Sequence, residues 1–196
     1  GTIDNDIACT EYTSGYETAM NTTMEMVDKL RDTAQSHDRC SVVEVMGRRA
    51  GYIALNAGIA CGATYIVVPE IGLDMDAMLN KIKAAKALGK RYFIIMVAEG
   101  EGHVDEIAER IEKETGIESS STVLGHVQRG GSPTVTDRVV ASQMGFHAVE
   151  LLKKGIGNRV VAQQAGKIVD FDIQEALSMK KEFPLDLYNI ANDISF

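Results

Sequence analysis

The chain has 196 residues and a formal net charge of −8 at pH 7, and this length suits one domain or one domain plus part of a second. Acidic charge argues against a general role on nucleic acid or on an anionic membrane surface. No apolar run is long enough to cross a bilayer, so we expect a cytoplasmic protein. Cys9, Cys40 and Cys61 are odd in number and lack paired spacing, which argues against a disulfide framework.

Predicted helices and strands alternate along the first part of the chain. Apolar residues at helical spacing predict helices over 18–31, 49–60, 74–88 and 104–115. We expect Thr13 or Ser14 to cap the first of these. Runs rich in apolar and β-branched residues predict strands over 41–46, 65–68, 92–97 and 121–124. Continuous apolar strands that alternate with helices predict an α/β fold whose parallel sheet is covered on both faces.

Polar residues follow every predicted strand: Gly47 with Arg48, Glu70, Glu99, and His126 with Arg129. Ligands of open parallel sheets bind at the carboxyl ends of the strands, so we expect a site at this edge. Gly47 and Arg48 precede a helix whose unpaired N–H groups suit an anion, although a glycine at such a turn often has a purely geometric role. His126 alone is more often structural, but Arg129 beside it favours phosphate binding.

Asp4 and Asp6 flank Asn5 near the start of the chain. On an extended backbone, side chains two residues apart point to the same side. The pair would therefore suit a general base next to a second acid or to a carboxylate linked to a metal. For an isolated motif of this kind, an Asx turn or a helix cap is the commoner interpretation.

Three motifs occur together in one order and spacing: residues 2–6 (TIDND), 45–48 (VMGR) and 125–133 (GHVQRGGSP). With them the chain resembles the C-terminal portion of ATP-dependent, bacterial-type members of the phosphofructokinase family. The resemblance implies a Rossmann-like three-layer sandwich with a mainly parallel sheet. It also implies transfer of the γ-phosphoryl group of ATP, with Mg²⁺, to the 1-hydroxyl of fructose 6-phosphate. The full-length enzyme would be a homotetramer with ADP or phosphoenolpyruvate as effectors.

The resemblance also implies residue roles. Asp4 would be the catalytic base, Thr2 and Arg48 would act on the transferring phosphoryl group, and Asp6 would lie near the metal-bound phosphates without a metal site of its own. The implied substrate contacts are Thr2, Asp4, Arg39 (to the neighbouring subunit's site), Met46, Gly47, Arg48, Glu99, His126 and Arg129. The implied effector contacts are Arg31, Gly62 and Lys90.

The family's two-domain architecture predicts how the chain is divided. Residues 1–15 would be an active-site segment of the first domain, and 16–127 the second, sugar-phosphate-binding domain. Residues 128–181 would return to the first domain, and 182–196 to the second. The chain begins within a polar loop, so we expect a fragment that is inactive alone because the nucleotide-binding part is missing.

Some positions depart from the family pattern. Ser120 stands where a second cross-subunit arginine is common, which affects the expected substrate affinity or identity. Leu88 replaces a basic effector contact and Thr64 an acidic one, which predicts a weak effector response. Two alternatives remain open: a pyrophosphate-dependent phosphofructokinase and a non-catalytic, effector-binding member of the fold. Pyrophosphate users usually carry Lys where this chain has Gly1, and this favours ATP.

Overall fold

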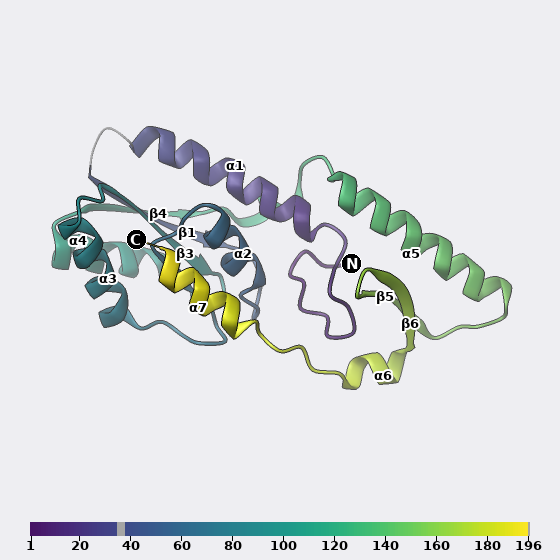
Figure 1. Ribbon diagram of the computed structural model, residues 1–196. Coiled ribbons are helices and arrows are strands. Elements are labelled where there is room, and N and C mark those ends of the chain that lie inside the picture. Colours follow the sequence, from purple (N-terminus) through teal and green to yellow (C-terminus); the bar gives the residue numbers. More distant parts are fainter. Residues whose placement is uncertain (35–37, 196) are drawn as a thin grey trace.

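The computed structural model describes residues 1–34 and 38–195 (Figure 1). Its main sheet is parallel and has four strands. In spatial order they are β2 (Tyr65–Val67), β3 (Tyr92–Ala98), β1 (Arg39–Val45) and β4 (Glu118–Val123). Because the strands are parallel, their carboxyl ends share one edge, where β1 leads into Gly47 and β3 into Glu99.

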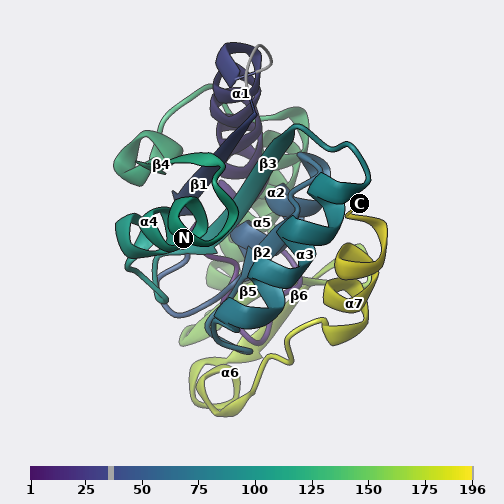
Figure 2. The ribbon, with the colours of Figure 1, turned by 90° about the vertical axis from the view of Figure 1, so that its left-hand side faces the viewer.

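Helices cover both faces of this sheet (Figure 2). One face packs against α1 (Tyr16–Ala34), α2 (Tyr52–Ala60) and α7 (Leu185–Ile194). The other packs against α3 (Met75–Ala87) and α4 (Val104–Thr115). Alternate residues of β1 serve the two cores, with Val43 and Val45 in the first and Val42 in the second. This arrangement confirms the predicted three-layer α/β fold. None of the helices within the described residues is long and apolar enough to span a bilayer.

Most predicted element boundaries hold to within a few residues. Helix α4 has the predicted bounds, and α3 begins just after Asp74, whose side chain accepts a hydrogen bond from Ala77 N at 2.9 Å. Helix α2 begins three residues later than predicted, at Tyr52 instead of residue 49, because a tight turn occupies the intervening residues.

A second structural unit lies beyond the sheet, and none of its helices and strands was predicted from the sequence. It comprises α5 (Val135–Lys153), the antiparallel pair β5 (Arg159–Gln164) and β6 (Lys167–Asp172), and α6 (Ile173–Ser178). Figure 1 shows residues 1–15 between this unit and the sheet. The N-terminal segment extends the unit, since Glu11 N donates to Gln163 O at 2.9 Å. The small core of the unit consists of Cys9, Ala162 and Ala176.

The carboxylate of Asp137 connects these parts. Asp137 is only 4% exposed, near the start of α5. One of its oxygens accepts from Tyr12 Oη at 2.5 Å and from Gly15 N at 2.6 Å. The other accepts from Thr18 N at 3.0 Å and from the Thr18 hydroxyl. Asp137 therefore satisfies N–H groups at the start of α1, and the prediction that Thr13 or Ser14 caps this helix is wrong.

Asp137→Ala should lower the free energy of unfolding by about 3 kcal/mol, because it leaves several partly buried donors without an acceptor. Burial alone would raise the pKa of Asp137, but hydrogen bonds from Thr18, Tyr12 and Gly15 outweigh it and hold the pKa below its ordinary value. The stabilisation should therefore be complete at neutral pH and decline as pH falls below about 4.

Urea unfolding of wild type and variant across this pH range measures the difference. The control is Glu150→Ala on the same helix, where a surface pair with Lys153 should contribute less than about 1 kcal/mol. Equal stability of Asp137→Ala and wild type at pH 7 would contradict the connecting role of Asp137.

Candidate active site

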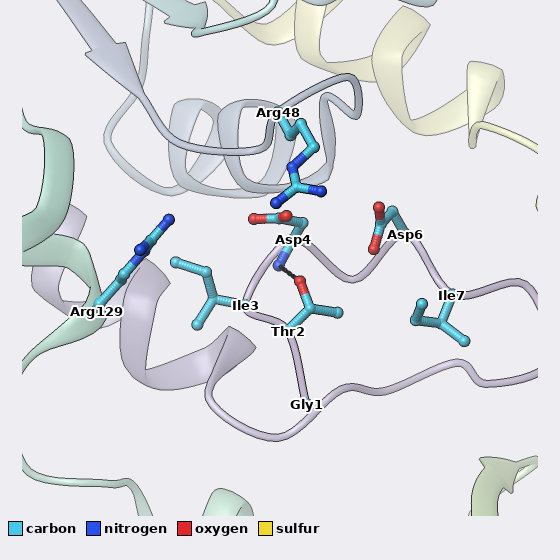
Figure 3. A pocket seen from close by; sticks show the side chains of 8 residues that line it. All are labelled: Gly1, Thr2, Ile3, Asp4, Asp6, Ile7, Arg48 and Arg129. Atoms are coloured by element: carbon cyan, nitrogen blue, oxygen red, sulfur yellow. Dashed lines mark hydrogen bonds between the residues drawn. The ribbon is translucent and has the colours of Figure 1, made fainter. Parts of the chain in front are cut away.

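A cleft of about 500 Å³ lies where the N-terminal segment meets the carboxyl edge of the sheet (Figure 3). Its lining residues come from three distant parts of the sequence: Gly1, Thr2, Ile3, Asp4, Asp6, Ile7, Arg48 and Arg129. In Figure 3 the Arg48 side chain points towards Asp4, and Arg129 lies on the opposite side of Asp4 from Asp6. The fold thus brings both carboxylates and two predicted arginines to one cleft.

We expected an extended backbone at Asn5, but it is left-handed, with φ of 53°. Asparagine tolerates this conformation better than most residues. Its side-chain amide donates to Glu11 O at 3.2 Å, and Thr2 Oγ1 accepts from Asp4 N at 3.1 Å. These local bonds shape the loop, and Asp4 and Asp6 both line the cleft despite the turn between them.

The environment of Asp4 favours a stronger base. Partial burial raises the pKa of its carboxyl group, and the negative charges of Asp6 and Glu99 act in the same direction. The Thr2 hydroxyl and the Arg48 guanidinium oppose this rise without cancelling it. A carboxylate with a raised pKa accepts a proton more readily, as general-base catalysis requires.

Arg48 occupies a constrained turn after β1. Gly47 has φ of 153°, and a Cβ atom there would lie 2.2 Å from Ala50 O, so only glycine fits. Arg48 itself is left-handed, with φ of 56°. Glu99 holds this turn because its Oε1 accepts from Arg48 N at 2.5 Å and from Gly47 N at 3.4 Å.

Carboxylates accept from the backbone N–H groups of this turn, which favours the geometric role of Gly47, the expected alternative to an anion site. The contact of Gly47 with substrate stays a prediction. Glu99 accepts from Gly47 and Arg48, and Glu70 accepts from Gly51 N at 2.9 and 3.1 Å. Carboxylates of the chain thus occupy the N–H groups of Gly47, Arg48 and Gly51. Negative charge on a ligand in the cleft would instead face the guanidinium groups of Arg48 and Arg129.

Gln128 is a buried polar residue that sequence reasoning overlooked. It is 1% exposed within the short 3₁₀ helix η1 (Gly125–Arg129). Its Oε1 accepts from Met46 N and from Thr23 Oγ1, each at 3.2 Å, and its Nε2 donates to Gly125 O at 3.1 Å. Gln128 thereby joins the end of β1 to the segment that presents Arg129. The position of Gln128 inside the GHVQRGG motif was the one feature of the sequence that could have pointed to it.

Other predicted substrate contacts lie outside the cleft. His126 is exposed and Met46 is buried, and neither lines it. Arg39 begins β1, at the far end of the strand from Arg48, and pairs with Glu118 at 3.0 Å. Arg39 is thus remote from the cleft of its own chain, and its contact with a neighbouring subunit stays a prediction.

The predicted effector residues lie near the amino-terminal edge of the sheet. Arg31 donates to the carbonyl of Cys61, which precedes Gly62. Burial lowers the pKa of Lys90 below its ordinary value. Thr64 is fully buried and Leu88 is 78% exposed.

Comparison with known proteins identifies the family. Residues 1–152 match the family model described as phosphofructokinase. The whole chain is 52% identical to an ATP-dependent 6-phosphofructokinase of Brevibacillus brevis and 53% identical to one of Clostridium tetani. The chain spans 61% of the length of each of these relatives.

Solved structures show the same fold. Phosphofructokinase from Saccharomyces cerevisiae superimposes with a TM-score of 0.86 at 34% identity, over 90% of this chain and 25% of that one. A pyrophosphate-dependent phosphofructokinase from Marinobacter aquaeolei gives a TM-score of 0.80 at 23% identity, over 94% of this chain and 53% of that one. The second likeness supports the fold alone. From the family match and these relatives we conclude that the chain belongs to the phosphofructokinase family.

Proposed function

We propose that the full-length protein transfers the γ-phosphoryl group of ATP to the 1-hydroxyl of fructose 6-phosphate, and that this chain supplies the sugar-phosphate side of the site. The observation that carries the proposal is the convergence of Asp4, Arg48 and Arg129 on one cleft. The names of the relatives support ATP as the phosphoryl donor. Phosphoryl transfer depends mainly on positioning and charge neutralisation, and this cleft offers both.

Each side chain then has a defined task. Asp4 takes the proton of the attacking hydroxyl, and its raised pKa suits that step. Arg48 stabilises negative charge on the transferring group with a planar guanidinium that is always protonated. Thr2 lines the cleft beside Asp4, and its hydroxyl oxygen accepts a hydrogen bond from Asp4 N. Arg129 binds the 6-phosphate, and His126, three residues earlier in η1, is its proposed partner in that contact.

The carboxylates of the cleft fit a magnesium ion that arrives with ATP. Within residues 1–34 and 38–195, no group of three or more His, Cys, Asp or Glu side chains is placed to hold a metal. Magnesium usually takes one or two carboxylates and completes its shell with phosphates and water. Asp6, which lines the cleft, would lie near such an ion, and the ion would neutralise phosphate charge.

The division into two domains is part of this proposal. Helix α5 exposes apolar side chains along its length, including Val135 at 79%, Phe146 at 70% and Leu152 at 70%. An apolar face of this size is normally covered. We assign this apolar face of α5 to contact with the rest of the first domain, because the relatives are longer than this chain. A cytoplasmic tetramer that ADP or phosphoenolpyruvate regulates stays a prediction.

The direct test is a coupled assay of the full-length protein with Mg²⁺, fructose 6-phosphate and either ATP or pyrophosphate. We expect turnover with ATP. Asp4→Ser should lower kcat by about 10²–10⁴-fold with little change in KM, because it removes a general base. The control, Asp76→Ser, changes an exposed carboxylate on α3 and should keep full activity. Near-normal kcat in Asp4→Ser would exclude Asp4 as the base, and turnover with pyrophosphate alone would identify the other donor.

Glu99→Gln should move the acid limb of the kcat/KM profile to lower pH. The limb reports protonation of the base, and activity is lost as pH falls through its pKa. The negative charge of Glu99 raises the pKa of Asp4, so its removal should lower that pKa. Glutamine retains an oxygen acceptor for the Gly47–Arg48 turn. A limb that stays in place, or moves to higher pH, would show that Asp4 is not the titrating base.

A further inference from the structure

Lys181 lies in the segment between α6 and α7, far in sequence from the loop that carries Asp4. Its ammonium group nevertheless donates to Asn5 O at 2.6 Å and to Thr10 O at 3.0 Å. The same nitrogen lies 5.0 Å from the centroid of the Tyr52 ring, within the range of a cation–π contact. One side chain thus contacts both the Asp4 loop and the first residue of α2.

Tyr52 is a firm anchor for this contact. It follows the Arg48 turn at the start of α2 and is 8% exposed. Its hydroxyl donates to Glu182 O at 3.3 Å, and its ring packs on Phe183 with centroids 5.9 Å apart. Its carbonyl accepts from Tyr16 Oη at 3.1 Å. The segment after Lys181 is therefore fixed to the element that follows Arg48.

The carbonyl groups of Asn5 and Thr10 both accept hydrogen bonds from the Lys181 ammonium group. Asn5 and Thr10 are both buried, and a buried carbonyl without a donor destabilises its conformation. Hydrogen bonds from a charged donor are the stronger kind. Burial lowers the pKa of Lys181, and the negative charge of Asp6 opposes that decrease. The loop around the left-handed Asn5 is thus held from outside as well as by its own bonds.

We propose that Lys181 is a positioning residue that sets the Asp4 loop against the Arg48 turn, by binding the carbonyls of Asn5 and Thr10 while it rests on Tyr52. This role of Lys181 rests on the proposed function, in which the loop carries the catalytic base Asp4. Lys181 lies outside the residues that line the cleft, so it acts through the loop and not on the substrate.

Hydrogen exchange on this chain tests the clamp without any need for activity. Lys181→Met keeps an apolar stem against Tyr52 but removes the donors, so the hydrogen-bonded amides of Asp4 and Thr10 should exchange about 10-fold faster or more. Lys181→Arg retains a charged donor and should restore most of the protection. The amides of β3, in the core, should be unchanged in both. The matched control is Lys180→Met, because Lys180 is exposed and donates to none of the described residues.

Kinetics of the full-length protein provide the second measurement. Lys181→Met should lower kcat about 10-fold or more while the KM for fructose 6-phosphate changes less than about 3-fold, because the loop that carries the base loses its alignment. Unchanged exchange of the Asp4 and Thr10 amides in Lys181→Met, or equal losses in the Met and Arg variants, would overturn the proposal. Absence of turnover in the unmodified protein would count against the proposed function only, and the exchange comparison would still decide the role of Lys181.

Discussion

The buried carboxylate of Asp137 is the interaction on which the arrangement of this chain depends. It accepts hydrogen bonds from Tyr12, Gly15 and Thr18, so one side chain on α5 fixes both the N-terminal segment and the start of α1. A buried charge is tolerated only where donors surround it, and here the donors come from parts of the chain more than 100 residues away. Asp137 acts together with the bond from Glu11 N to Gln163 O and with Lys181, which hold the same segment at other points.

Acidic and amide side chains perform related tasks around the cleft. Glu99 and Glu70 satisfy backbone N–H groups at the turn before α2, and Gln128 joins the end of β1 to η1. These acceptors occupy the N–H groups of Gly47, Arg48 and Gly51, while the side chains of Arg48 and Arg129 line the cleft. Arginine suits this role because its charge is permanent and its donors are arranged as a fork. Glu70, Glu99 and Gln128 therefore hold the backbone around the cleft, and the cationic groups that face the cleft belong to Arg48 and Arg129.

The sequence alone predicted the sheet and its helices well, because strands such as residues 92–97 and amphipathic helices such as 104–115 have strong periodicity. It also predicted that Asp4, Arg48 and Arg129 belong together, through motifs and not through spacing. It could not predict that Asp137 caps α1 or that Lys181 reaches Asn5, since such tertiary bonds have no local pattern. It could not predict that Glu99 accepts from the N–H groups of Gly47 and Arg48, because this carboxylate follows a different strand.

The central claim is that the cleft around Asp4, Arg48 and Arg129 recognises a phosphorylated sugar. Titration of the isotopically labelled chain with fructose 6-phosphate, followed by amide NMR signals, tests it directly. The account predicts that the signals of Thr2, Asp4, Arg48 and Arg129 shift together, that Arg129→Ala abolishes these shifts, and that unphosphorylated fructose does not produce them. Shifts confined to residues remote from the cleft, or equal shifts with fructose, would contradict it.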